Sequence, residues 1–406
     1  MFKINKRITD SFSYIFVSGA SKGFNYILLL YFAVGIYSQQ YVSILLLLSL
    51  EQILSLLLPL NQSSIIYSKS ISNHQNITNK IITSSFLVVF VIILMFFLLK
   101  NVIYNYFNVH LIIVYISIFV SMLINSYMVY LTNYYKLIEE HKKALLIQGL
   151  LLITFLSIIG SIYIFKNIIV AFFLGKAIGL LIVLVIVIVF NLQKFQFKLD
   201  YLNWNEIKQI LNLFSVSVLG WLSGLGFMNL AKQYSNTNEL AEIGYILNVF
   251  NVFLLFSVGV NSIYGPIIRN HLMQKALNKA LKIKSRVFIV YLSVGVLFFL
   301  VYILFSEFNL NQKSKAIINV VPYVLLIYIF NAFNWVSQPF YLILNKFKDY
   351  NLVNIITYLV WGFLILMCSY FEYQNYIWFL IAIHFFKGLF SYFYAKMNFM
   401  NRKYET

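Results

Sequence analysis

The sequence predicts an all-α polytopic membrane protein with about 12 transmembrane helices, arranged as two pseudo-symmetric six-helix lobes around a central cavity. Three observations support this fold class. The 406-residue chain is 61% hydrophobic and only 10% charged, whereas soluble proteins carry about 25% charged residues. Apolar segments recur at about the 20-residue length that a helix needs to cross a bilayer. The second half of the chain also repeats the first.

The predicted spans follow one another along the whole chain. Each is expected to be helical, because a helix satisfies its own backbone hydrogen bonds within lipid. The first span begins too late, is too long and lacks a small-residue cleavage signal, so we expect a retained helix and not a signal peptide. The predicted spans are 11–33, 41–66, 81–99, 109–133, 143–165, 168–191, 209–231, 243–267, 286–305, 317–343, 350–370 and 375–397.

Charge placement predicts which side of the membrane each loop faces. If the N-terminus is cytoplasmic, 22 of the 30 Lys and Arg residues fall on the cytoplasmic side, five outside and three within spans. This asymmetry predicts a multi-pass membrane protein with both termini in the cytoplasm. The net charge of +18 is explained by basic loops that face anionic headgroups. Membrane lipids, and not nucleic acid, are therefore the expected partners. The densest basic cluster is Arg269, Lys275, Lys279, Lys282, Lys284 and Arg286.

The two halves of the chain resemble each other in span positions and loop lengths. An offset of 202 residues places the span at 41–66 on residues 243–268, and an offset of 211 places Lys176 on Lys387. Both halves begin on the same side of the membrane, as in transporters that rock one lobe against the other. The predicted parts are an N-terminal lobe at 1–192, a cytoplasmic linker at 193–208 and a C-terminal lobe at 209–406.

Enzymatic function is disfavoured. The longest loops have about 15–20 residues and are too short to fold into a catalytic domain. The sequence shows no glycine-rich phosphate loop, carboxylate pair or Ser/His/Asp set. The single Cys368 excludes an intrachain disulfide and a cysteine metal cluster, and the five histidines have no ligand spacing. We therefore expect a protein that is not an enzyme and that has no metal and no cofactor.

Two stretches carry a resemblance to a known family. They are YFAVGIYSQQYVSILLLLSLEQILSLLLPLNQSSIIYS (31–68) and NELAEIGYILNVFNVFLLFSVGVNSIYGPIIRN (238–270). The first resembles the opening of polysaccharide flippases, with a short loop and a second helix that closes on small polar residues. The second resembles their seventh-to-eighth-span region. With the span count and paired lobes, the chain resembles the Wzx-type O-antigen flippases of the multidrug/oligosaccharidyl-lipid/polysaccharide exporter superfamily.

The resemblance implies a role in O-antigen and lipopolysaccharide biosynthesis and a place in the bacterial inner (cytoplasmic) membrane. The expected cargo is an undecaprenyl-diphosphate-linked oligosaccharide, moved from the cytoplasmic to the periplasmic leaflet by alternating access. The polysaccharide polymerase and chain-length regulator are candidate protein partners. Two alternatives remain open: a multidrug or cation antiporter of the same fold, and a membrane polysaccharide polymerase. A multidrug exporter would more naturally line its cavity with carboxylates, and polymerases usually carry one large periplasmic loop.

Lys22 lies near the middle of the first predicted span. A lysine at this depth costs roughly 3 kcal/mol. At helical spacing it shares a polar stripe with Asn25, which predicts that both face the cavity and that Lys22 meets the cargo diphosphate. A structural ion pair and a lysine that reaches back to the headgroups are the alternatives.

Glu51 is the only acidic residue within the predicted spans. It is expected to neutralise Lys22 in the resting cavity or to exchange a proton during transport. The alternative is a buried glutamate that burial keeps protonated, with no mechanistic role.

Lys176 and Lys387 occupy equivalent places in the sixth and twelfth spans. They are expected to share a role, as a ring of positive charge in both lobes, unless both reach back to the headgroups.

Amide side chains form stripes along two further spans. Such groups suit sugar hydroxyls, although they more often hold membrane helices together. The candidate sugar contacts are Asn248, Asn251, Asn331, Asn334 and Gln338.

Overall fold

The computed structural model describes residues 17, 23–61, 74–137, 140–190, 200–233, 235–274, 276–306, 312–343, 347–370 and 375–400. The described part is helical, with short turns and no strand. Ten of its helices are long and apolar enough to cross a membrane, and a shorter apolar helix covers Gly23–Gly35. These findings confirm an all-α, multi-pass membrane protein.

The chain forms two compact units. Unit 1 comprises Met1–Ile15, Tyr26–Ser38 and Leu222–Thr406, and unit 2 comprises Phe16–Asn25 and Gln39–Trp221. The boundaries of the predicted lobes stay a prediction.

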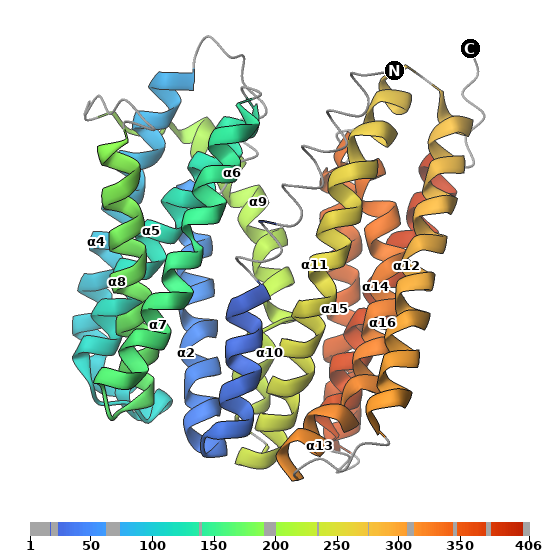
Figure 1. Ribbon diagram of the computed structural model, residues 1–406. Helices are drawn as coiled ribbons and strands as arrows, with labels where there is room; N and C mark the ends of the chain where they lie inside the picture. Colours follow the sequence, from blue (N-terminus) through green and yellow to red (C-terminus); the bar gives the residue numbers. More distant parts are fainter. Residues whose placement is uncertain are drawn as a thin grey trace. The chain divides into compact units, whose positions relative to one another are not determined.

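The helices of unit 2 are drawn from blue to light green in Figure 1. They are α2 (Ser38–Leu57), α4 (His74–Phe107), α5 (Ile112–Leu137), α6 (His141–Leu150), α7 (Leu152–Ile164), α8 (Ile168–Val189) and α9 (Trp204–Leu222).

Most of the blue helix at Gly23–Gly35 belongs to unit 1, and the other helices of unit 1 run from yellow-green to red (Figure 1). These are α10 (Gly226–Ala231), α11 (Thr237–Met273), α12 (Leu277–Ser306), α13 (Gln312–Asn319), α14 (Val321–Ile343), α15 (Phe347–Tyr370) and α16 (Tyr376–Ala395).

Three predicted spans are divided between two helices. The span at 143–165 corresponds to α6 and α7, the span at 209–231 to α9 and α10, and the span at 317–343 to α13 and α14. Composition alone does not reveal such breaks, because the residues on both sides remain apolar.

The end of α2 shows how the fold satisfies an interrupted helix inside the membrane. Pro59 has no N–H, so the helix cannot continue regularly through it, and a short 3₁₀ turn spans Pro59–Asn61. The Asn61 amide donates to the Ser55 carbonyl and, at 2.9 Å, to Ser126 Oγ. Ser85 Oγ accepts from the Leu60 N–H at 3.3 Å. These bonds replace those that the helix would have made, as lipid requires.

Helix α8 packs along α7 through two glycines, Gly175 and Gly179. A Cβ at Gly175 would lie 2.8 Å from the Ile158 Cα, and one at Gly179 would lie 2.6 Å from the Thr154 Cα. Small residues four apart on one helix face permit such an approach in membranes. The contact fixes how α8 is rotated about its axis.

Candidate functional site

Glu51 and Lys176 form an ion pair inside unit 2. The Lys176 Nζ donates to both Glu51 Oε1 and Oε2, at 2.7 Å each. The side chains of Lys176 and Glu51 are 20% and 6% exposed, respectively. A carboxylate that binds an ammonium through both oxygens has a charge-assisted, well-aligned partner. The pair lies within α2 and α8, two of the helices that can cross the membrane.

Neighbouring contacts hold both members of the pair in place. On the α8 side, Gly175 sits against α7 and thereby sets the direction of the adjacent Lys176. On the α2 side, the Trp221 indole N–H donates to both the carbonyl and the Oγ of Ser49, at 3.1 Å each. Ser49 is fully buried and lies two residues before Glu51. The carboxylate therefore sits on a segment of α2 that is bonded on its α9 side as well.

A buried pair of this kind can respond to protons or cations. Removing one partner from a buried ion pair leaves an uncompensated charge and costs about 3–5 kcal/mol. A proton on Glu51, or a cation that competes for its oxygens, would weaken the attraction to Lys176 and free the ammonium. The arrangement therefore joins α2 to α8 through a contact that depends on the charge of Glu51.

The pairing differs in partner from the sequence expectations. Glu51 was expected to neutralise Lys22, but Lys22 lies outside the described residues, and Glu51 binds Lys176. Lys176 and Lys387 lie in different units, as expected for one lysine in each half, and their shared role stays a prediction. Whether Lys22 meets the cargo stays a prediction.

Lys387 is partly buried in α16. Among the described residues no carboxylate pairs with it, in contrast to Lys176. Three residues earlier on the same helix, His384 is 4% exposed. Its Nδ1 accepts from the Asn331 amide at 2.8 Å, which places the imidazole as a polar link between α16 and α14.

The candidate sugar contacts lie at different depths. Asn331, Asn334 and Asn248 are buried, with 5%, 5% and 1% exposure. Asn331 bonds to His384, and Asn334 Oδ1 accepts from the Tyr350 hydroxyl at 3.3 Å. These two bonds between helices are the structural use of membrane amides. Sugar contact by any of the amides stays a prediction. The remaining candidates, Asn25, Asn251 and Gln338, are partly buried.

Sequence reasoning missed Trp221 and its bond to Ser49. Trp221 lies in the middle of the predicted span 209–231, where an aromatic side chain is unremarkable. No spacing in the sequence shows that this indole reaches a helix 172 residues away.

The described residues offer no group of three or more His, Cys, Asp or Glu that could hold a metal ion. No protein-family model matches the sequence. No curated protein matches it either.

Solved transporter structures match the fold over nearly the whole chain. The eukaryotic MATE transporter AtDTX14 superposes with a TM-score of 0.64 at 12% identity, covering 95% of this chain and 94% of that chain. A MOP superfamily transporter from Pyrococcus furiosus, described as having a binding pocket of reverse polarity that suggests a different function, gives 0.65 at 12% identity, covering 95% and 94%. The MATE multidrug transporter DinF-BH, solved in complex with rhodamine 6G, gives 0.67 at 13% identity, covering 96% and 93%. The chain thus has the fold of the MATE transporters of the MOP superfamily.

Proposed function

We propose that this chain is an ion-coupled exporter that moves an amphiphilic cargo across the bacterial inner membrane. The observation that carries the proposal is the buried Glu51–Lys176 pair, at 2.7 Å, in a chain with a transporter fold. An ion-coupled transporter needs a group whose affinity for the coupling ion differs between its conformations. A glutamate inside the membrane, paired with an ammonium, supplies such a group.

The coupling follows from the chemistry of the pair. When Glu51 takes up a proton or binds a cation, Lys176 loses its counter-charge and becomes available to an anion. When Glu51 loses this proton or cation, its carboxylate pairs with Lys176 again and displaces an anion bound there. In this scheme the cation and the anion are bound together and released together.

The charges within the membrane helices of the two units favour an anionic cargo. The Glu51–Lys176 pair is neutral overall, whereas Lys387 has no paired carboxylate in the described part. A cation held within a membrane helix suits a phosphate-bearing ligand. This supports the lipid-linked oligosaccharide that the sequence resemblance implies, with a diphosphate head and sugars carried across while the polyprenyl tail stays in lipid. Cytoplasmic termini, and contacts with a polymerase and a chain-length regulator, belong to the same proposal.

A multidrug antiporter is the second candidate, and the fold likeness supports it at least as well. One similar structure is described as a multidrug resistance MATE transporter and another was solved with rhodamine 6G. In this candidate Glu51 would exchange protons for an organic cation, and the lysines would be structural.

Transport in proteoliposomes separates the two candidates. The purified chain is reconstituted with a proton gradient and offered either a fluorescent undecaprenyl-diphosphate oligosaccharide or rhodamine 6G. We expect translocation of the diphosphate lipid, and a loss of its dependence on the gradient in Glu51→Gln. The control is Glu242→Gln, which removes an exposed carboxylate.

Two results would contradict parts of the proposal. Transport of rhodamine 6G alone would establish the antiporter and refute the lipid cargo. Gradient-dependent transport that persists unchanged in Glu51→Gln would refute coupling through the ion pair, whatever the cargo.

A further inference from the structure

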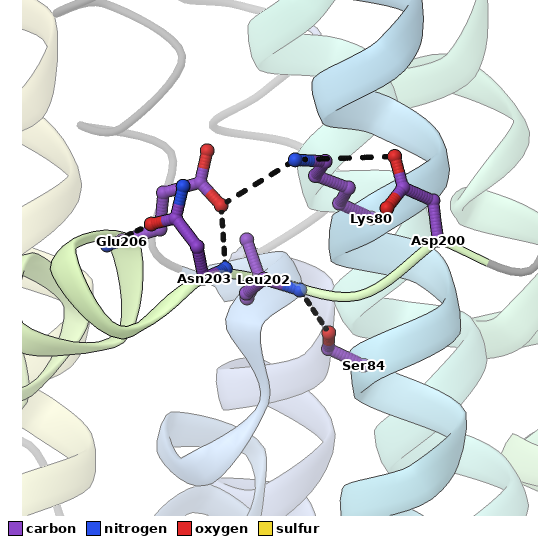
Figure 2. Close-up of polar contacts among 6 residues, drawn as sticks. All are labelled: Lys80, Ser84, Asp200, Leu202, Asn203 and Glu206. Carbon is purple, nitrogen blue, oxygen red and sulfur yellow. Dashed lines mark hydrogen bonds and ion pairs between the residues drawn. The ribbon is translucent and has the colours of Figure 1, made fainter.

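The segment that leads into α9 is fastened to α4 (Figure 2). The Lys80 Nζ lies 3.9 Å from Glu206 Oε2 and 3.9 Å from Asp200 Oδ2. Ser84 Oγ, one turn further along α4, accepts from the Leu202 N–H at 3.3 Å. The Glu206 side chain is 7% exposed, whereas that of Asp200 is 48% exposed. Glu206 therefore contributes more of the electrostatic attraction, because exposed ion pairs are worth little.

Glu206 also caps the N-terminus of α9, the helix that it holds against α4. The Asn203 N–H donates to Glu206 Oε2 at 2.8 Å, and the Glu206 N–H donates to Asn203 Oδ1 at 2.9 Å. This reciprocal pair satisfies free N–H groups at the first turn of α9. One carboxylate thus both starts α9 and binds it to Lys80.

The other end of α9 is bonded within the same unit. The Trp221 indole donates to Ser49 of α2, and Trp221 is the last residue of unit 2 in this part of the chain. Helix α9 is therefore attached to unit 2 at its first and last turns, although the repeat pattern predicts it as the first helix of the second half.

Immediately after Trp221 the chain enters unit 1 and contacts residues of that unit. Ser223 hydrogen-bonds with Tyr358 of α15, and the Phe227 ring packs on Trp361 with 5.8 Å between centroids. Both contacts lie within unit 1. Between these attachments the regular helix is interrupted at residues 223–225, a turn that contains Gly224.

We propose that residues 223–225 are a hinge and that α9 moves with unit 2 when the transporter changes conformation. A hinge is a short segment that absorbs a change in backbone angles between rigid parts. Gly224 lowers the cost of that change because it has no Cβ. Lys80 and Trp221 are the positioning residues that keep α9 in unit 2. The inference rests on the proposed function as a transporter but not on the identity of its cargo.

Distances between spin labels test this assignment. In a Cys368→Ser background, nitroxide labels are attached in pairs at Leu87→Cys of α4, Leu211→Cys of α9 and Leu359→Cys of α15. All three positions are exposed, at 51%, 53% and 68%. Pulsed electron resonance then gives the three distances in acidic and in alkaline buffer.

The expected pattern is specific. Between the two buffers the 87–211 distance should change by less than about 2 Å, the scale above which a change counts as a rearrangement. The 87–359 and 211–359 distances should both change by more than this. A changed 87–211 distance with a constant 211–359 distance would place α9 with unit 1 and overturn the proposal. Three constant distances would also overturn it, because no hinge then moves.

A disulfide gives an independent measurement. In the same background, Ser84→Cys/Leu202→Cys is oxidised so that α9 is covalently tied to α4. The 211–359 distance should still change with pH in the cross-linked protein, and a frozen distance would refute the hinge. Because these measurements do not involve cargo, a failed hinge and a failed transport proposal give different results.

Discussion

The Lys176 ammonium and the Glu51 carboxylate, 125 residues apart in the sequence, meet at 2.7 Å through both carboxylate oxygens. Each side chain alone would be an expensive occupant of a transmembrane helix. Together they form a neutral unit that α2 and α8 can hold in the membrane. The pair therefore links the packing of two helices to the charge state of one carboxylate.

Removing either member of the pair should destabilise the protein more than removing both. We expect Glu51→Gln and Lys176→Met each to lower the free energy of unfolding by up to about 3–5 kcal/mol, because the remaining charge loses its partner. Since Lys176 is 20% exposed, the loss for Glu51→Gln should fall below that limit. The double variant should recover most of the stability. The free energy of unfolding is measured in detergent micelles for the unmodified protein, the two single variants and the double variant.

The deciding comparison is between the loss of unfolding free energy in the double variant and the sum of the losses in the two single variants. If the double variant loses as much as both single variants together, the two side chains do not interact. The pair would then be unable to act as a coupling group.

Gly175 should be intolerant of any side chain. A Cβ there would lie 2.7 Å from Ser161 Oγ and 2.8 Å from the Ile158 Cα, so a backbone has to move. We expect Gly175→Ala to lower the free energy of unfolding by about 1–3 kcal/mol, the usual cost of overpacking. It should also shift Lys176 away from Glu51. The matched control is Gly160→Ala, because a Cβ at Gly160 meets nothing within 4 Å. Equal stability of the two variants would contradict the close α7–α8 contact.

Much of the fold could be predicted from the sequence, because lipid restricts spanning segments to apolar helices. The segments at 81–99, 286–305 and 350–370 lie within α4, α12 and α15. The interruption between α9 and α10 could not be predicted. It depends on which neighbours hold each side of residues 223–225, and the residues themselves remain apolar or small.

The sequence indicates both Glu51 and Lys176 as candidate site residues, but it does not show that they pair with each other. Glu51 and Lys176 are conspicuous because charges within spans are rare. Their contact depends on the rotation of α8, which Gly175 and Gly179 set against α7. The lysine-to-lysine offset of the repeat instead suggested a shared role for Lys176 and Lys387. The carboxylate at Glu51 has no equivalent at the 202-residue offset of its own span, because residue 253 is Phe.

The side of each loop is a prediction from charge placement. Reporter fusions at residues 37, 104, 237, 310 and 373 should read periplasmic, and fusions at 74, 138, 200, 278 and 347 should read cytoplasmic. The expected pattern follows the excess of Lys and Arg in cytoplasmic loops. Alkaline phosphatase and green fluorescent protein fusions report the two sides. A reversed reading at two adjacent sites would refute the twelve-span topology.

Lys387 should matter through its charge if the cargo is anionic. It lies beside Gly388, whose backbone would bring any Cβ against the Phe330 carbonyl of α14, so its helix is held closely in position. We expect Lys387→Gln to reduce translocation of the diphosphate lipid at least tenfold, since about 1.4 kcal/mol of lost interaction already gives that factor. Lys387→Arg should keep most of the activity, because the positive charge remains even though the guanidinium geometry differs. Translocation in proteoliposomes is compared at equal amounts of folded protein, judged by gel filtration. If Lys387→Gln transports the lipid normally, this lysine has no part in cargo binding, and the argument from charge for an anionic cargo fails with it.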